Sequence, residues 1–130
     1  MAGELILIVE DNLRNLKLAR DLLQIHGFRT VEATSAVDAV SAAETHLPHL
    51  ILLDIQLPDG DGISVLARLR GDPMTARIPV VALTAFAMSG DRERFIEAGF
   101  SSYISKPIAV MTFAATVQQL CDDTSVREPA

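Results

Sequence analysis

Cysteine is nearly absent from this sequence, since Cys121 stands alone among 130 residues. A single cysteine cannot form an internal disulfide, and no Cys/His spacing typical of a zinc site is present. Because structural disulfides belong to oxidising compartments, the sequence favours the reducing cytoplasm as its setting.

Positive charge is also scarce. Lys and Arg together number 11 against 17 Asp and Glu, which gives a formal net charge of -6 and a pI near 4.9. A protein that wraps nucleic acid needs a basic face for the phosphates, so no nucleic-acid partner is expected. The acidic balance is compatible with a small cation site.

Long apolar segments are missing as well. No run approaches the roughly 20 residues needed to cross a bilayer. The first residues, Met1 to Glu4, do not form the basic stretch and long apolar segment of a signal peptide. We therefore expect a cytoplasmic protein without a membrane partner, and a length that suits one domain with a well-buried core.

Short apolar runs are what the chain does contain. Leu5–Val9, Leu50–Leu53 and Val80–Leu83 are apolar without alternation. Runs of this length are typical of strands buried on both faces, as in a parallel sheet covered by helices. Thr30–Ala33 and Ser102–Ser105 carry more polar residues, so we expect them to be strands at the two edges of the sheet.

Helical patterns alternate with these strands. The signals are a stripe of Leu16, Ala19, Leu22 and Leu23 ended by Gly27, a capping box at Ser35–Asp38 that opens a helix ending before Pro48, the segment Ile63–Leu69, the segment Asp91–Ala98 stopped at Gly99, and a last stripe of Val110, Phe113, Ala114, Val117 and Leu120. Five strands alternating with five helices predict an α/β domain joined by right-handed crossovers. The class is the doubly wound (βα)5 flavodoxin-like fold, a five-stranded parallel sheet of order 2-1-3-4-5. We expect this domain to occupy residues 1–122, and residues 123–130 to form a short polar C-terminal tail.

Acidic residues follow the first and third predicted strands. In an open parallel sheet, ligands bind beyond the carboxyl ends of the strands where the strand order reverses, which here lies between these two strands. Glu10, Asp11 and Asn12 end the first strand and Asp54 ends the third. Carboxylates brought together there repel one another unless a hard divalent cation such as Mg²⁺ joins them. For Asn12, capping of the first helix is the preferred interpretation, whereas Asp11 with Asp54 favours a metal site.

Two further polar residues end the remaining strands of the predicted sheet. Thr84 follows the fourth strand, where its hydroxyl could donate to a phosphoryl oxygen or simply cap a turn. Lys106, one of two lysines, follows the fifth strand and is either an exposed loop lysine or the cation that balances the carboxylates. Pro107 after it permits a cis peptide bond. The convergence of Glu10, Asp11, Asp54, Thr84 and Lys106 is the strong signal, because each residue alone is a weak one.

Four ordered motifs now define a family resemblance. They are Ile8–Asn12, Leu53–Pro58 with Asp61-Gly62, Leu83–Ala85 and Tyr103–Pro107. In these motifs the sequence resembles a response-regulator receiver domain over nearly its whole length. It is most similar to single-domain regulators of the DivK kind and also to the receivers of hybrid histidine kinases.

The resemblance implies a role for each motif residue. Asp54 would accept a phosphoryl group from the phosphohistidine of a histidine kinase or histidine phosphotransferase. Asp11, Asp54 and the backbone carbonyl of Gln56 would hold Mg²⁺, with Mn²⁺ as an alternative ion. Glu10 stands where many receivers have Asp and would act on the metal mainly through water. Thr84 and Lys106 would bind the phosphoryl oxygens.

The resemblance also implies an output. Thr84 and Tyr103 would form a switch that changes the face of the fourth helix, fifth strand and fifth helix, where a downstream protein target would bind. Gln56 and Phe86 occupy positions that resemble those tuning the phosphoryl lifetime. The chain would be a phospho-acceptor signalling domain that assists its own phosphorylation and dephosphorylation, rather than an enzyme with a separate substrate.

These motifs leave other functions open. A flavodoxin-like FMN binder would need a phosphate-cradling loop after the first strand, where Glu10-Asp11 stand instead. A metal-dependent phosphatase with Asp54 as nucleophile would need an acid/base carboxylate where Gln56 stands. Within the receiver class, the chain could be a single-domain adaptor, a phosphorelay intermediate or a receiver segment of a hybrid histidine kinase. The segment 59–62 is interpreted as a turn before the third helix, because it lacks the further ligands of a calcium loop.

Overall fold

The computed structural model describes residues 3–85 and 91–127, with the side chains of 91, 92 and 124–127 excepted. Five parallel strands form the main sheet: β1 (Leu5–Val9), β2 (Arg29–Ala33), β3 (Leu50–Asp54), β6 (Val80–Thr84) and β7 (Ser102–Ser105). Their order is β2-β1-β3-β6-β7, which is the predicted 2-1-3-4-5 arrangement. The three apolar strands lie in the middle and the two polar ones at the edges, so the sequence assignment of centre and edge is confirmed.

Five helices connect the strands: α1 (Leu13–Ile25), α2 (Ala36–His46), α3 (Gly62–Arg70), α4 (Asp91–Ala98) and α5 (Phe113–Arg127). Three of them begin at a side chain that accepts backbone N–H groups. Asn12 caps α1, Ser35 caps α2 and Asp61 caps α3. The capping roles predicted for Asn12 and Ser35 are therefore confirmed, and the segment 59–62 does lead into α3.

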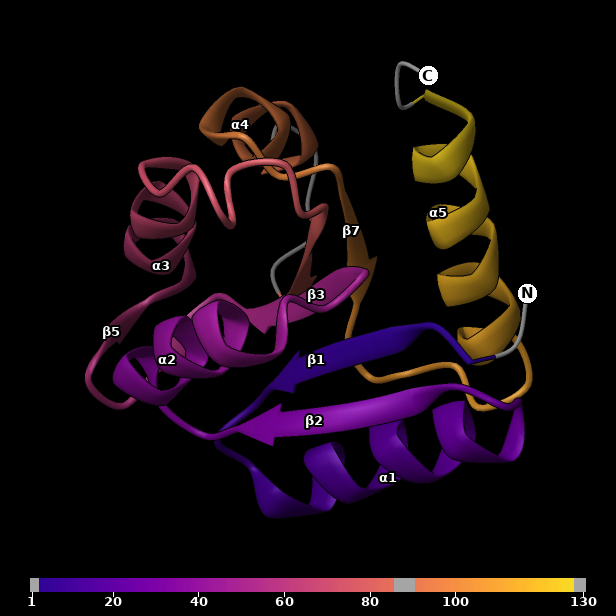
Figure 1. Ribbon diagram of the computed structural model, residues 1–130. Helices are drawn as coiled ribbons and strands as arrows, with labels where there is room; N and C mark the ends of the chain where they lie inside the picture. The colour runs from indigo at the N-terminus through magenta and orange to yellow at the C-terminus, as the bar shows by residue number, and fades with distance from the viewer. Residues whose placement is uncertain (1–2, 86–90, 128–130) are drawn as a thin grey trace.

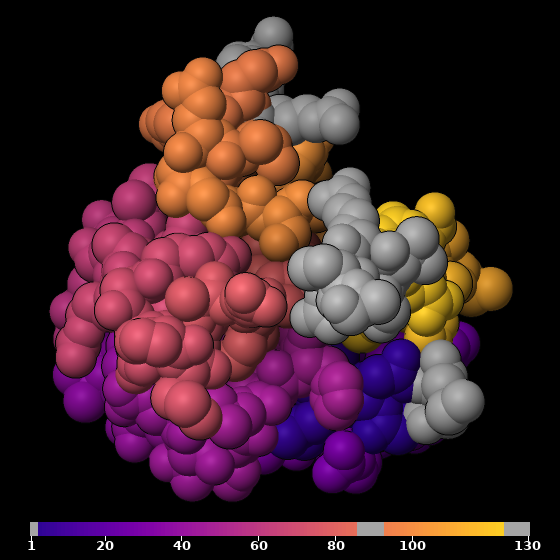
Figure 2. Space-filling view, turned by 45° about the horizontal axis from the view of Figure 1, so that its top comes forward, coloured from indigo at the N-terminus to yellow at the C-terminus, as the bar shows by residue number. Residues whose placement is uncertain are grey.

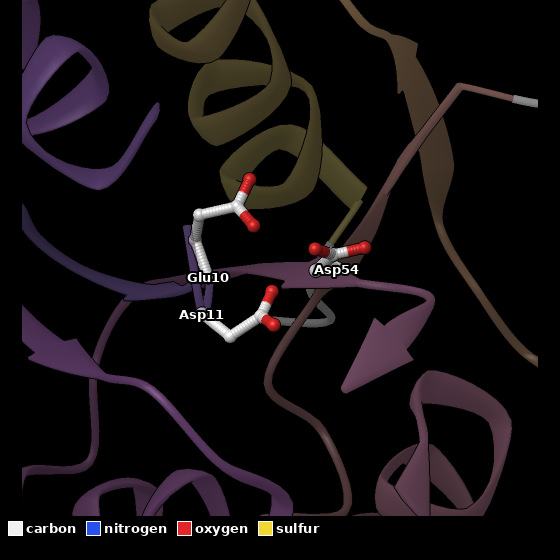
Figure 3. A group of neighbouring side chains, drawn as sticks. All are labelled: Glu10, Asp11 and Asp54. Atoms are coloured by element: carbon white, nitrogen blue, oxygen red, sulfur yellow. The ribbon is translucent and has the colours of Figure 1, made fainter. Parts of the chain in front are cut away.

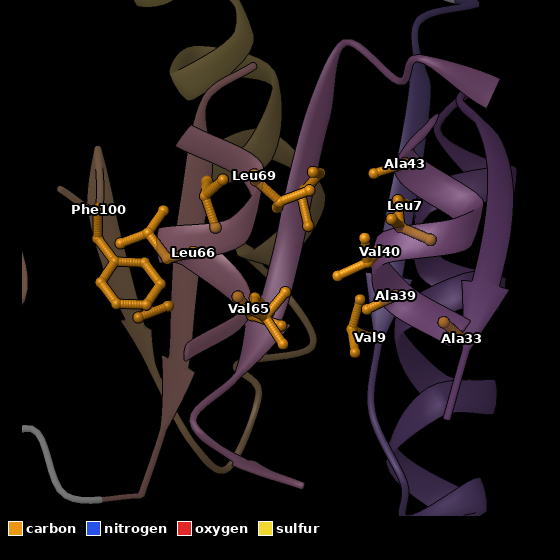
Figure 4. Close-up of a cluster of buried hydrophobic side chains, with 14 of the residues drawn as sticks. Leu7, Val9, Ala33, Ala39, Val40, Ala43, Val65, Leu66, Leu69 and Phe100 are labelled. Carbon is orange, nitrogen blue, oxygen red and sulfur yellow. The ribbon is translucent and has the colours of Figure 1, made fainter. Parts of the chain in front are cut away.

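The helices cover both faces of the sheet (Figure 1). Helices α1 and α5 pack on one face, over a core that includes Ile8, Leu52 and Leu83. Helices α2, α3 and α4 pack on the other, where Leu66 and Phe100 belong to the second core (Figure 4). Because successive strand residues point to opposite faces, each central strand contributes to both cores. This explains why those strands are apolar at every position.

Two elements differ from the sequence prediction. Val110 was expected on the buried stripe of the last helix, but α5 begins at Phe113 and Val110 is exposed. The helix then continues to Arg127, into the segment expected to be a polar tail. Polar residues can extend a helix once its apolar face is docked, so the loss of the apolar stripe after Leu120 does not mark the helix end.

A small hairpin after β3 was not predicted. Strands β4 (Gln56–Leu57) and β5 (Gly60–Asp61) pair antiparallel, outside the main sheet. Two-residue strands are too short to show any hydrophobic period, which is why the sequence pattern does not reveal them. The hairpin lies at the carboxyl edge of the sheet, next to Asp54, and so belongs to the site described below.

Arg70 connects segments at the opposite end of the sheet. Its guanidinium donates to the backbone oxygens of Ala76 and Ile78 and to that of Gly99, at 3.1, 2.7 and 3.1 Å. In the space-filling view the orange residues of α4 stand above the salmon segment between α3 and β6 (Figure 2). Arg70 links that segment to Gly99, the residue that follows α4. No helix within the described residues is long and apolar enough to cross a membrane.

Candidate functional site

Three carboxylates meet at the carboxyl ends of β1 and β3. Glu10 and Asp11 follow β1, and Asp54 is the last residue of β3. One oxygen from each lies within 4.8 Å of the other two. Figure 3 shows the side chains of Asp11 and Asp54 turned toward each other with Glu10 beside them. The pairing of Val9 with Leu53 brings the ends of the two strands to the same level, as predicted from the sequence.

The three carboxylates differ in exposure. Glu10 and Asp54 are 2% and 5% exposed, whereas Asp11 is open to solvent. Two buried carboxylates this close to a third are costly unless cations compensate them. The arrangement therefore offers an acidic site that a ligand can enter from the Asp11 side.

Lys106 supplies one compensating charge. Its ammonium nitrogen lies 3.0 Å from Glu10 Oε1 and 3.0 Å from Asp54 Oδ2. The lysine is thus the cation of the site, and the exposed-loop interpretation is wrong. Its peptide bond to Pro107 is cis. One ammonium that contacts two carboxylates of a group of three cannot neutralise the whole group when it is ionised.

Burial and the neighbouring charges shift the pKa of two of these groups. Burial, together with the hydrogen bond and repulsion from Asp54, raises the pKa of Glu10 to about 7, although Lys106 partly opposes the rise. Burial alone would lower the pKa of Lys106, but its hydrogen bonds with Asp54 and Glu10 outweigh that effect and raise it. Lys106 therefore remains charged at neutral pH, and the repulsion between Glu10 and Asp54 is only partly relieved.

The hairpin begins directly at the acidic cluster. Asp54 Oδ1 accepts a hydrogen bond of 3.0 Å from the backbone N–H of Gln56. At the other end of the hairpin, Gly62 approaches the strand so closely that a Cβ there would lie 2.9 Å from the backbone oxygen of Asp54. Gln56 is therefore held beside Asp54, and glycine is required where α3 starts.

Thr84 and Tyr103 lie on one face of the sheet. Thr84 ends β6 and is 2% exposed, and its backbone oxygen accepts the N–H of Lys106 at 2.8 Å. The alternation of β6 places Thr84 on the face of Ala82, in whose cluster Tyr103 packs. The Tyr103 ring lies 6.4 Å from that of Phe95 in α4. The residue Phe86, named with Gln56 in the sequence analysis, lies outside the described residues.

One contact at this site was missed from the sequence. Asp59, in the turn of the hairpin, accepts hydrogen bonds from the backbone N–H groups of Ala36 and Val37 at the start of α2. The sequence shows an acidic turn residue and, far from it, a helix start. Nothing in the linear pattern joins the two.

The chain belongs to the response regulator receiver domain family, whose model matches residues 6–118. Membership places the protein in phosphorylation-based two-component signalling.

Known proteins of this family resemble the chain closely. The polar-differentiation response regulator DivK of Brucella ovis is 46% identical over 118 residues, which are 91% of this chain and 96% of that protein. The DivK of Brucella anthropi is 45% identical over the same lengths. The resemblance to DivK inferred from the four motifs is therefore confirmed.

Solved structures agree with the fold. The receiver domain of a sensor histidine kinase from Pseudomonas aeruginosa PAO1, solved with a magnesium ion coordinated in its active-site cleft, is 35% identical with a TM-score of 0.83. It is matched over 93% of this chain and 99% of that one. A CheY-like receiver protein from Methanospirillum hungatei, 23% identical with a TM-score of 0.86, matches 98% of this chain and 100% of its own. The acidic cluster is thus of the kind that receives a divalent cation in this fold.

Proposed function

We propose that this domain accepts a phosphoryl group on Asp54 from a phosphohistidine donor. The observation that carries the proposal is the position of the Asp54 carboxylate, which contacts Lys106 at 3.0 Å and shares a 4.8 Å cluster with Glu10 and Asp11. A nucleophilic carboxylate needs charge compensation, because it approaches a phosphoryl group that is itself negative. Lys106 provides part of that compensation and a cation in the cluster would provide the rest.

The donor set suits Mg²⁺, with Mn²⁺ as the alternative. Carboxylate and carbonyl oxygens are the ligands these ions take, and the single ammonium of Lys106 cannot balance a cluster of three carboxylates. Asp11, Asp54 and the backbone carbonyl of Gln56 would hold the ion, with Glu10 acting through water. The magnesium ion in the related Pseudomonas receiver supports this assignment. When bound, the ion would neutralise charge on the phosphoryl oxygens.

The chain's own residues then position the reacting groups. One Asp54 oxygen forms the new O–P bond while the P–N bond of the phosphohistidine breaks and its electron pair returns to the imidazole nitrogen. Lys106 and the Thr84 hydroxyl would bind the phosphoryl oxygens, whose charge is spread in a loose transition state. Such a domain assists its own phosphorylation and needs no separate substrate.

The signal would leave the site through Thr84 and Tyr103. Both lie on the face of the sheet that α4 covers, and Tyr103 already contacts Phe95 of that helix. A phosphoryl group adds roughly 1.5 to 2 negative charges and new acceptor oxygens, which would draw Thr84 toward Asp54. Tyr103 would follow and alter the face formed by α4, β7 and α5, to which a downstream protein binds.

The setting follows from the same proposal. The donor would be a histidine kinase or histidine phosphotransferase in the cytoplasm. The domain would act as a single-domain regulator, with a phosphorelay intermediate or a hybrid-kinase receiver as the alternatives. Residues 1–122 would form most of the receiver, whose last helix, α5, continues to Arg127.

Phosphotransfer measurements test the central proposal. We expect wild-type protein with Mg²⁺ to become labelled by a phosphorylated histidine protein or by acetyl phosphate, and Asp54→Asn to remain unlabelled. Asp72→Asn is the matched control, since Asp72 lies in the loop before β6 and accepts the backbone N–H of Met74. Failure of the wild type with every donor, or equal labelling of Asp54→Asn, would refute the proposal.

The switch requires a separate experiment. We expect Thr84→Ala and Tyr103→Ala to accept the phosphoryl group but to lose the phosphorylation-dependent gain in target binding, measured by pull-down with a stable phosphoryl mimic. Normal coupling in both variants would show that the signal leaves the site by another route.

A further inference from the structure

Asp59 fastens the hairpin to a helix that is distant in sequence. Its Oδ1 lies 2.6 Å from the backbone nitrogen of Ala36 and its Oδ2 lies 3.1 Å from that of Val37. These are the first two N–H groups of α2, which have no partner within the helix. The third, from Asp38, is accepted by Ser35 Oγ at 3.1 Å. The start of α2 is thus capped from two directions, by its own preceding residue and by the hairpin.

The other end of the hairpin is fixed to the main sheet. The N–H of Ile55 donates to the backbone oxygen of Leu83, and the N–H of Gly62 donates to that of Ile55, at 3.2 and 2.8 Å. Asp54 accepts the N–H of Gln56. Gln56 therefore lies between a base attached to β3 and β6 and a turn attached to α2. The hairpin that contains Gln56 is thus attached at both ends.

A helix cap alone would not require this long-range contact. Helices α1 and α3 begin with a cap from the residue directly before them, Asn12 and Asp61. Asp59 reaches α2 from 23 residues along the chain. The approach is close elsewhere too, because a Cβ on Gly60 would lie 3.5 Å from that of Ala36. The N–H groups of Ala36 and Val37 lower the pKa of Asp59, so it stays charged and keeps both hydrogen bonds at neutral pH.

We propose that Asp59 is a positioning residue for the cation site. By anchoring the hairpin turn to α2, it would hold the Gln56 carbonyl beside Asp11 and Asp54. The inference rests on the proposed function, because it assumes that the cluster takes Mg²⁺. Residues that orient metal ligands without touching the metal commonly contribute about tenfold or more to its affinity.

Calorimetric titration with MgCl₂ alone tests this role. We expect Asp59→Ala to bind Mg²⁺ roughly tenfold more weakly than wild type. Ser35→Ala is the matched control, because it removes a cap from the same helix end but leaves the hairpin attached. It should lower the unfolding midpoint to a similar degree and keep the wild-type Mg²⁺ affinity within about twofold. The Mg²⁺ affinity of Asp59→Asn should lie between those of wild type and Asp59→Ala, since the amide oxygen of Asn can accept one of the two N–H groups.

Amide hydrogen exchange supplies a readout that does not depend on the metal. Residues 55–61 should exchange faster in metal-free Asp59→Ala than in metal-free Ser35→Ala. Equal Mg²⁺ affinity in wild type and Asp59→Ala, or equal losses in Asp59→Ala and Ser35→Ala, would overturn the positioning role while leaving the proposed function intact. If wild type itself binds no Mg²⁺, the proposed cation site fails and this inference fails with it.

Discussion

At the scale of single residues, the site contains more acidic groups than basic ones. Lys106 contacts both Glu10 and Asp54 but carries only one positive charge. Asp11 adds a third carboxylate from the solvent side. Burial disfavours the charged form of Glu10, and the hydrogen bond and repulsion from Asp54 add to this effect, so the pKa of Glu10 is raised.

The raised pKa of Glu10 predicts a pH-dependent stability in the absence of divalent ions. The pKa of this carboxyl is about 4.5 in the unfolded chain and about 7 in the folded protein, so between these values the folded protein holds a proton that the unfolded chain has lost. Its stabilising contribution is present below about pH 4.5 and is lost as the pH rises through 7. Over this range the loss is at most on the order of 3 kcal/mol.

Urea unfolding in EDTA at pH 5 and pH 8 measures this effect. We expect Glu10→Gln to gain stability relative to wild type as the pH rises, because the amide has no proton to lose. Parallel pH profiles for the two proteins would contradict the prediction. Added Mg²⁺ should reduce the difference, since a bound cation favours the ionised carboxylate.

At the scale of elements, the hairpin and the start of α3 both pack against Asp54. Gly62 is the point of closest approach, with Asp54 O and Ile55 Cα at 2.9 and 3.0 Å from a Cβ placed there. Both neighbours are backbone atoms, which cannot rotate away as a side chain can. The end of β3, which carries Asp54, and the start of α3 are therefore closely packed, with no space for a side chain between them.

Substitution at Gly62 should lower both the stability of the fold and the Mg²⁺ affinity of the site. We expect Gly62→Ala to lower the free energy of unfolding by about 1–3 kcal/mol, as overpacking does, and to weaken Mg²⁺ binding by displacing Asp54. Gly71→Ala at the other end of α3 is the control, because its Cβ would meet only ordinary contacts, the nearest at 3.5 Å from Ala67 O. Guanidinium unfolding and Mg²⁺ titration of both variants provide the measurements. Equal stability and equal Mg²⁺ affinity of the two variants would show that the space at Gly62 is not limiting.

The elements also show what the sequence can and cannot predict. Strand order followed from polarity, because only strands buried on both faces are apolar throughout, and the ends of β1 and β3 then placed Asp11 beside Asp54. The attachment of Asp59 to α2 could not be predicted, since it depends on where the chain folds back in space. The end of α5 was also missed, because a helix with one docked turn continues through polar residues without an apolar signal.

At the scale of the whole molecule, one sheet separates two apolar cores that share its central strands. Leu52 and Leu53 are neighbours in β3, are both fully buried, and belong to opposite cores. Damage to either core should therefore weaken the entire domain if it unfolds as one cooperative unit. A probe located in only one core can test this.

Cys121 is such a probe. It is 6% exposed in the core beneath α1 and α5, and burial, with the charges of Glu4 and Asp122, raises the pKa of its thiol to about 11. A buried, protonated thiol reacts with alkylating reagents only after the protein opens. At pH 8, we expect labelling of Cys121 to be slow and to follow the equilibrium between folded and open forms.

Leucine substitutions on both sides of the sheet then decide whether that opening is global. Leu52→Ala and Leu53→Ala should each cost about 2 kcal/mol or more, and each should accelerate Cys121 labelling by about 30-fold or more at equal reagent concentration. Met111→Cys in a Cys121→Ser background is the exposed control, because Met111 is 93% exposed and a thiol there should react at once. If only Leu52→Ala accelerates labelling, α5 opens locally and the two cores are not coupled. If both variants accelerate labelling, the domain opens as one cooperative unit. The site at the carboxyl edge of the sheet is then stabilised by both cores.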